Sequence, residues 1–322
     1  MKKRIASLLT VVLILGSTAC SSPSASAVDQ PIQSASEKDS TTKADTVPAT
    51  SPAAPSATSA AQTEAPVEEP AKTEDASIEE TLLVDEKDIR ITVTGLEYDG
   101  WMGPAVKVLI ENGSDKDLTV QTRASSVNGY MMESMISADV AAGKKANDEI
   151  SFMSSDLEAA GISGIADIEL SFHVFTTDGW DEYLDTEPVT IKTSLADDYE
   201  YTFDDAGEVL YDKKDIRIIA KGISNDDSLF GPGLILFIEN LGKKSITVQA
   251  RDVSVNGFMI DHSLSSEVSP QKRSIDAMTF FQSDLEENSI EKITDVELAF
   301  HIFETSDWDT IDDTKKYVLE FE

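Results

Sequence analysis

Few residues in this chain could do acid–base or nucleophilic chemistry, and the best placed of them is a histidine that occurs twice. His173 lies in a segment that returns 128 residues later with His301 in the same place. Glu169, Ser171 and His173 occupy alternate positions, so they would share one face of a strand and supply the residue types of a hydrolase triad. The counterpart of Ser171 is Ala299, and a regular strand lacks the sharp turn that exposes a nucleophile. We therefore expect both histidines to form hydrogen bonds on an outer sheet face, and we expect no enzyme.

Carboxylates crowd the loop that follows each histidine segment. Calcium takes six to eight oxygen ligands, and closely spaced carboxylates can supply several of them. Because the chain contains 60 Asp and Glu residues, acidic loops arise throughout it, so calcium is a secondary hypothesis and no other cofactor is expected. Zinc and nucleotide sites are not predicted, since the sequence has no cysteine cluster and no Gly-rich phosphate loop. The candidate metal ligands are Asp178, Asp181 and Asp185 in the first loop and Asp307, Asp309 and Asp312 in the second.

Each acidic loop also contains a tryptophan followed by an aspartate. Trp180 and Trp308 are equivalent under the same shift. An indole flanked by carboxylates could stack on a sugar or contact a protein, or it could plug the end of the domain. The plug is the favoured interpretation, because both copies keep the Trp-Asp pair while the surrounding loop changes. Together with His173 and His301, these tryptophans are the candidate ligand-binding residues.

The strands and loops that position these side chains belong to a unit that the chain contains twice. A repeat of 128 residues is too long for a solenoid unit and suits an independent domain. We predict two domains, repeat 1 at 79–194 and repeat 2 at 207–322, joined end to end by a connector at 195–206. The segments related by the shift include Ile110–Asn112 with Ile238–Asn240, Ser126–Gly129 with Ser254–Gly257, and Ser155–Glu158 with Ser283–Glu286.

Apolar and polar residues alternate within each repeat, which is the pattern of half-buried strands. The segment Ile168–Val174 is one such row. Asn128–Gly129 and Asn256–Gly257 are pairs that tolerate positive φ, so they should close two-residue hairpins. About seven short antiparallel strands per repeat favour an immunoglobulin-like β-sandwich over a closed barrel. A single short helix is expected at Ser155–Ala160, capped by a serine or an aspartate.

Four of these segments together resemble a known family. They are the strand ending in Ile-Glu-Asn, the Val-Gln-x-Arg strand, Ser-Val-Asn-Gly, and the Asp-Ile-Glu-Leu-x-Phe-His strand of repeat 1. The combination resembles immunoglobulin-like domains of unknown function in lipoproteins and secreted proteins of Gram-positive bacteria, over about Glu79 to Glu322. The resemblance implies a tandem all-β sandwich fold and an extracytoplasmic compartment, and it brings no catalytic residues.

The N-terminus has the features of a secretory signal. Met1–Arg4 is basic, Ile5–Gly16 is apolar but short for a membrane span, and small residues precede Cys20, the one cysteine of the chain. This arrangement resembles the lipobox of bacterial lipoproteins and departs from it at Ser17, where leucine is commonest. The resemblance implies that residues 1–20 form a lipoprotein signal peptide and that Cys20 carries a palmitate-type lipid anchor. The alternative is an ordinary secreted protein, in which a lone cysteine would be a reactive liability.

Composition and charge complete the functional hypothesis. Residues 21–78 are rich in Ser, Ala, Thr and Pro and should form a disordered tether. The formal net charge of −34 repels nucleic acid and anionic lipid, so neither is an expected ligand. We therefore expect a non-enzymatic lipoprotein, anchored to the cell membrane, whose two modules bind an envelope protein or glycan. A passive spacer is the alternative. The methionine-rich hairpin Tyr130–Met135 is a further docking candidate, although its methionines suit a core strand better.

Overall fold

The structure is a computed structural model that describes residues 76–224 and 231–321. The predicted signal peptide, Cys20 and nearly all of the predicted tether therefore lie outside the described residues. The described chain is almost entirely β, as the sequence predicts. Its two helices are α1 (Ser154–Ala159) and α2 (Gln282–Glu287). Within the described ranges, no helix is both long enough and apolar enough to cross a membrane.

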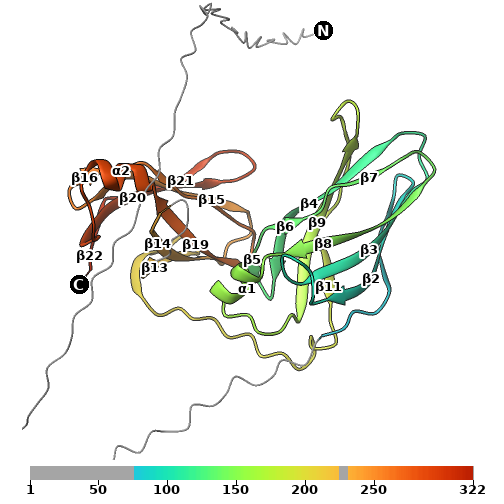
Figure 1. The fold of residues 1–322 in the computed structure, drawn as a ribbon, viewed down its shortest axis with the longest axis horizontal. Coiled ribbons are helices and arrows are strands. Elements are labelled where there is room, and N and C mark those ends of the chain that lie inside the picture. The colour runs from blue at the N-terminus through green and yellow to red at the C-terminus, as the bar shows by residue number, and fades with distance from the viewer. Residues whose placement is uncertain (1–75, 225–230, 322) are drawn as a thin grey trace, which may run out of the picture. The chain divides into compact units, whose positions relative to one another are not determined.

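Each repeat contributes two layers of strands (Figure 1). In repeat 1 the strands are β1 (Thr81–Glu86), β2 (Ile89–Glu97), β3 (Ala105–Asn112), β4 (Leu118–Val127), β5 (Tyr130–Met131), β6 (Ser134–Met135), β7 (Ala138–Val140), β8 (Lys145–Phe152), β9 (Asp167–Thr176), β10 (Glu182–Asp185) and β11 (Val189–Lys192). One layer has the order β1-β2-β3-β8-β6, and the other is built on the β4–β9 pair.

Repeat 2 follows the same plan. Its strands are β12 (Glu208–Lys213), β13 (Ile216–Ser224), β14 (Gly233–Asn240), β15 (Ile246–Val255), β16 (Phe258–Met259), β17 (His262–Ser263), β18 (Ser265–Val268), β19 (Lys272–Phe280), β20 (Asp295–Glu304), β21 (Thr310–Asp313) and β22 (Tyr317–Glu320). One layer is β12-β13-β14-β19, and the other is built on the β15–β20 pair.

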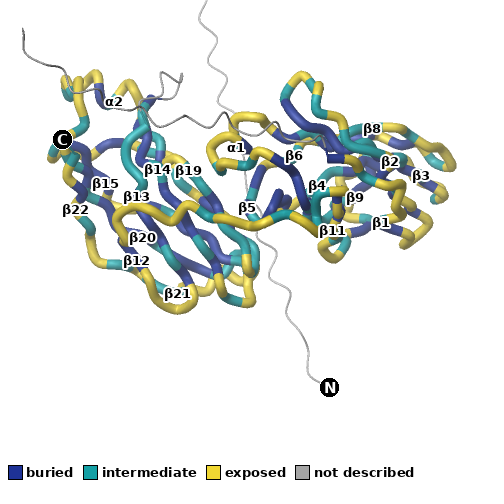
Figure 2. Tube along the Cα trace, turned by 90° about the horizontal axis from the view of Figure 1, so that it is seen from below, coloured by how far each residue is buried: buried dark blue, intermediate teal, exposed yellow. Residues whose placement is uncertain are grey.

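The alternation in the sequence matches the burial of the strands (Figure 2). Along β9, Ile168, Leu170, Phe172 and Val174 are all buried, and the residues between them are only partly covered. Burial of such side chains stabilises each sandwich by about 1.5–3 kcal/mol per residue relative to leaving it exposed. Their positions on one face of β9 direct His173 to the opposite face, as predicted.

Both predicted hairpins are present. β4 ends at Val127 and β5 begins at Tyr130, with φ of 49° at Asn128 and 81° at Gly129. The equivalent turn of repeat 2 joins β15 to β16 with φ of 50° and 80°. Asparagine and glycine are the residue types that reach this left-handed region at least cost.

The two repeats are more closely joined than an end-to-end arrangement requires. β5 pairs with β19 in parallel at Tyr130 and Arg273, so one layer of repeat 1 and one layer of repeat 2 form a single 11-stranded sheet. Both repeats fall within one compact unit of the chain.

One local expectation was wrong and a second was confirmed only in part. The N-cap of α1 is Met153 and makes no side-chain hydrogen bond, because Ser155 and Asp156 already lie inside the first turn. In the methionine-rich hairpin, Met132 is buried, but Met135 is exposed on β6, an edge strand that pairs with β8 alone among the described strands.

Candidate functional site

A stacked pair of aromatic rings lies at the β9–β10 turn of repeat 1. Phe175 lies two residues after His173 on β9, and it is buried beneath Trp180. The two rings are 5.1 Å apart between centroids with an interplanar angle of 12°. Trp180 covers Phe175 with one face and is still 75% exposed. The tryptophan is therefore a cover over Phe175 that also offers a large apolar surface to solvent, rather than a plug inserted into the sandwich core.

The turn holds Trp180 in an unusual backbone conformation. Its φ is 58°, in the left-handed region that bulky residues rarely adopt. The Trp180 N–H donates to the Thr176 carbonyl at 2.9 Å, and the Asp181 N–H donates to the Thr176 hydroxyl at 3.1 Å. A non-glycine residue in this region costs about 1–3 kcal/mol, which the surrounding hydrogen bonds and the stack must offset.

A histidine–carboxylate pair extends this surface along β9. The His173 Nδ1 contacts the Asp185 carboxylate of β10, and the His173 ring lies 5.2 Å from Phe175. Arg123 of β4 also approaches Asp185, with 3.7 Å between Nη1 and Oδ2. A row of four side chains thus crosses the outer face of the sheet, in the order Phe175, His173, Asp185 and Arg123. We call Trp180, Phe175, His173 and Asp185 the aromatic strip of repeat 1.

Repeat 2 builds the same strip from equivalent residues. Trp308 has a φ of 61° and stacks on buried Phe303 at 5.2 Å and 12°. His301 lies 5.1 Å from Phe303, and its Nδ1 is 2.6 Å from the Asp313 carboxylate. Trp308 is 73% exposed. All four candidate ligand-binding residues are thus brought together in two matching pairs.

Glu169, Ser171 and His173, the residue types of a hydrolase triad, are not assembled for catalysis. The Ser171 hydroxyl donates to the Arg123 carbonyl at 3.3 Å instead of reaching the imidazole. The Glu169 carboxylate is 3.1 Å from the Lys272 ammonium. The carboxylate partner of His173 is therefore Asp185 and not Glu169.

Two of the candidate metal ligands are hydrogen-bonded to other side chains. In the part of the chain that the structure describes, no group of three His, Cys, Asp or Glu side chains is arranged to hold a metal ion. Asp185 is held by His173, and Asp312 accepts a hydrogen bond from the Tyr211 hydroxyl at 2.8 Å. That hydrogen bond and the nearby Lys214 hold the pKa of Asp312 below its usual range. Calcium at these loops stays a prediction of the sequence.

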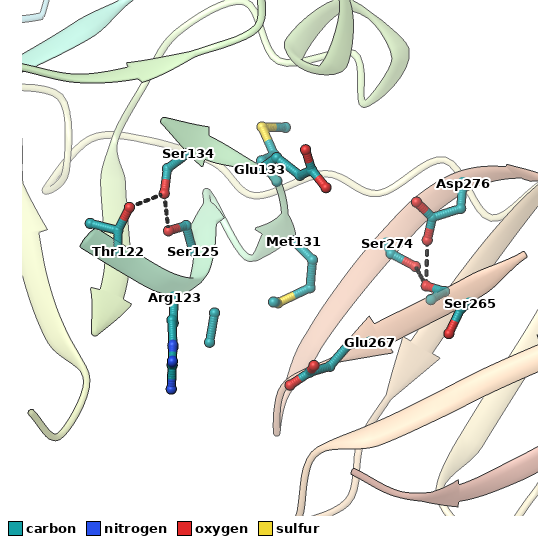
Figure 3. A pocket seen from close by; sticks show the side chains of 13 residues that line it. Thr122, Arg123, Ser125, Met131, Glu133, Ser134, Ser265, Glu267, Ser274 and Asp276 are labelled. Atoms are coloured by element: carbon teal, nitrogen blue, oxygen red, sulfur yellow. Dashed lines mark hydrogen bonds between the residues drawn. The ribbon is translucent and has the colours of Figure 1, made fainter. Parts of the chain in front are cut away.

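A polar pocket between the repeats was missed by the sequence reasoning (Figure 3). Its volume is about 430 Å³. On the repeat 1 side the Ser134 hydroxyl is hydrogen-bonded to Thr122 at 2.7 Å and to Ser125 at 2.5 Å. On the other side lie Glu267, whose pKa is raised by burial, and a Ser274–Ser266–Asp276 network. No signal in either repeat alone could reveal this pocket, because its walls come from both.

Comparison with known proteins adds little. No family model and no curated protein matches the chain. It is similar to a solved YadV chaperone with a TM-score of 0.22 and 11% identity, covering 73% of this chain and 100% of that chain. It is also similar to the Salmonella enterica SafA pilin in complex with the SafB chaperone, with a TM-score of 0.20 and 10% identity, covering 67% of this chain and 89% of that chain. At such TM-scores neither likeness carries an argument.

Proposed function

We propose that this chain is a non-enzymatic lipoprotein, anchored to the cell membrane through lipid on Cys20, whose two repeats bind an envelope protein or glycan through their aromatic strips. The observation that supports it is the duplicated Trp–Phe stack. A strained tryptophan with most of its surface exposed is retained at the same position in both repeats. Strained residues cluster at binding sites, where the rest of the structure compensates for their cost.

The chemistry of the strip suits a polar partner with an apolar face. An exposed indole can stack on a sugar ring or on a side chain, and the adjacent Asp185 or Asp313 carboxylate can accept hydrogen bonds from hydroxyl or amide donors. Because the Trp180 ring is already fixed by Phe175, binding would order few side chains and lose little entropy. Two weak sites on one chain would also bind a multivalent partner more tightly than one site does.

A non-enzymatic role is supported by the partners of the most reactive side chains. His173 and His301 are each bonded to a carboxylate, and neither has a serine nucleophile within hydrogen-bonding reach among the described residues. The alternative, a passive spacer, needs no exposed aromatic surface. It is favoured by the joined 11-stranded sheet, which holds the two repeats together.

The test is a binding assay on the full chain, with soluble envelope polysaccharide and solubilised envelope protein as separate probes. We expect Trp180→Ala and Trp308→Ala each to weaken binding of one probe severalfold, and the double variant to abolish it. Trp101→Ala is the matched control, because Trp101 is 96% exposed and belongs to neither stack. Failure of both probes to bind the wild-type chain, or equal binding by the double variant, would favour the spacer.

A further inference from the structure

The Asn-Gly hairpin of repeat 1 is docked on repeat 2. The Gly129 carbonyl accepts a hydrogen bond from the Arg273 N–H at 2.9 Å, which continues the sheet from β5 to β19. Tyr130 is only 3% exposed and lies 5.5 Å from Phe203 and 6.5 Å from Phe237, measured between ring centroids. The chain therefore contains both a hairpin and a strand edge that receives it.

Charged groups fix the position of this contact. The Arg273 guanidinium lies 3.5 Å from the Phe203 ring centre and forms an ion pair with Glu239 at 2.8 Å. The Lys272 ammonium is 3.1 Å from the Glu169 carboxylate of repeat 1. The contact thus combines a backbone hydrogen bond, an apolar side chain and an ion pair between the repeats.

The hairpin of repeat 2 has the docked conformation with no docking partner in the described chain. The Asn256 amide donates to the Lys292 carbonyl at 2.8 Å and accepts from the Thr294 N–H at 2.8 Å. Asn128 makes the same pair of bonds in repeat 1, to Gly164 and from Ala166. Phe258, at the position of Tyr130, is 47% exposed, and Met259 beside it is 67% exposed.

The position of this hairpin in the fold agrees with its exposure. β5 pairs with β19, whereas β16 pairs with β15 and is labelled at the side of repeat 2 away from β5 (Figure 1). The aromatic and methionine side chains of the free hairpin are therefore presented to solvent on a backbone that needs no rearrangement to bind.

The receiving edge is also present twice. Lys145 of β8 lies opposite Glu111 and forms an ion pair with it. Arg273 of β19 lies opposite Glu239 in the same register and also forms an ion pair. Beyond its contact with β6 at Ser151 and Phe152, β8 pairs only with β3 among the described strands. In the described part of the chain, the outer edge of β8 near Lys145 is thus open to another strand.

We propose that a second copy of this chain occupies these surfaces, so that the repeat 2 hairpin of one copy docks on the β8 edge of the next. The Gly257 carbonyl would accept the Lys145 N–H, as Gly129 accepts Arg273. Phe258 would pack on Leu109, which has the place of Phe237. The contact is heterologous, because a hairpin meets a strand edge, and it therefore leads to head-to-tail chains of copies.

Differences between the two edges make this association weaker than the contact within the chain. Three apolar residues lie side by side across the strands of repeat 2: Ile219, Phe237 and Ile275. The residues at the same places in repeat 1 are Thr92, Leu109 and Asn147. Glu297, the counterpart of Glu169, already lies 3.2 Å from Lys316. The net charge of −34 adds repulsion that salt screens over about 8 Å at physiological ionic strength. We therefore expect reversible, concentration-dependent assembly.

Sedimentation velocity of the full chain at physiological ionic strength tests the proposal. The protein concentration is varied from micromolar to about 1 mM, because contacts with millimolar dissociation constants form at the upper end of this range. We expect the average sedimentation coefficient to rise with concentration. Phe258→Asp on the hairpin, and Lys145→Pro on the receiving edge, should each weaken association at least tenfold. Val318→Asp changes an apolar residue of β22 that is 56% exposed, against 47% for Phe258, and should leave association unchanged.

A mixture of the two disabled variants gives the sharpest result. The Phe258→Asp copy keeps its receiving edge and the Lys145→Pro copy keeps its hairpin, so the mixture should form dimers and nothing longer. Far-ultraviolet circular dichroism must first show that each variant is folded, and Lys145→Asp replaces the proline variant if it is not. A wild-type chain that stays monomeric, or a Phe258→Asp chain that associates like wild type, overturns the proposal. Association that appears only with an added envelope protein also overturns it and assigns the hairpin to a different partner.

Discussion

The Asn-Gly hairpins of the two repeats share one backbone conformation and have opposite surroundings. Tyr130 in repeat 1 is buried against repeat 2, and Phe258 in repeat 2 is half exposed. Their φ values differ by only one degree at each turn residue. The conformation is therefore set by the hairpin and its asparagine anchor, while the burial is set by whatever lies opposite.

The surfaces that lie opposite show how the duplicated unit diverged. Ile219 and Phe237 of repeat 2 belong to the same apolar cluster as the core of repeat 1. Their counterparts Thr92 and Leu109 lie on the outer face of repeat 1, beside Lys107 and its ion pair with Glu149. The equivalent outer sheet face is thus apolar in repeat 2, where it is covered, and mainly polar in repeat 1.

The largest difference is expected when the two hairpin aromatics are removed. Tyr130→Ala empties a buried site between two phenylalanine rings and should lower the free energy of unfolding by about 3 kcal/mol. Phe258→Ala removes a half-exposed ring and should cost less than about 0.5 kcal/mol. Urea unfolding of both variants measures this comparison, and equal losses would mean that the repeat 1 hairpin is not docked.

A smaller difference is expected at the paired basic residues. Arg273→Ala removes a mostly buried ion pair and a cation–π contact, and it should cost about 2 kcal/mol. Lys145→Ala removes an exposed ion pair with Glu111 and should leave unfolding almost unchanged, because water solvates both charges. The same urea titration checks the order of the two variants. A larger loss for Lys145→Ala would reverse the comparison.

Exchanging the residues of the outer faces should have a smaller effect still. Phe237→Leu gives repeat 2 the residue of repeat 1 and should destabilise the chain by about 1 kcal/mol, because the cover over Tyr130 loses volume. Leu109→Phe places the larger ring on the open face and should be nearly neutral. Thermal unfolding of the two variants provides the measurement, and a stabilising Phe237→Leu would contradict the packing described.

The smallest expected effect is a pH dependence in the connector, because Tyr201 is 41% exposed and solvent reduces the contribution of its raised pKa. Burial, together with a hydrogen bond to Asp167, raises the pKa of Tyr201 to about 12. A pKa raised above the unfolded value of about 10 means that the neutral hydroxyl is favoured in the folded chain. Its contribution is complete below pH 10 and is lost as pH rises from 10 to 12. Tyr201→Phe should flatten this part of the stability profile. An unchanged slope would show that Tyr201 is not responsible.

Local patterns in the sequence predicted the local structure well. Alternation placed Phe172 inside and His173 outside, and Asn128–Gly129 gave the hairpin at the right residue, because both follow from the short-range geometry of the backbone. The joined sheet could not be predicted, since it depends on Arg273 meeting Gly129 from a distant part of the chain. The stack of Trp180 on Phe175 was not predicted, because the favoured interpretation made Trp180 a plug and the exposure of an aromatic ring depends on how its loop turns.

Amide hydrogen exchange of the dilute full chain tests the difference between the repeats most directly. Arg273 and Lys145 occupy equivalent edge positions, but within residues 76–224 and 231–321 only the Arg273 N–H has a hydrogen-bond acceptor on a hairpin. We predict strong protection at Arg273 and exchange at Lys145 close to the rate of an open strand edge. Equal exchange at the two amides would contradict the asymmetric use of the duplicated hairpin.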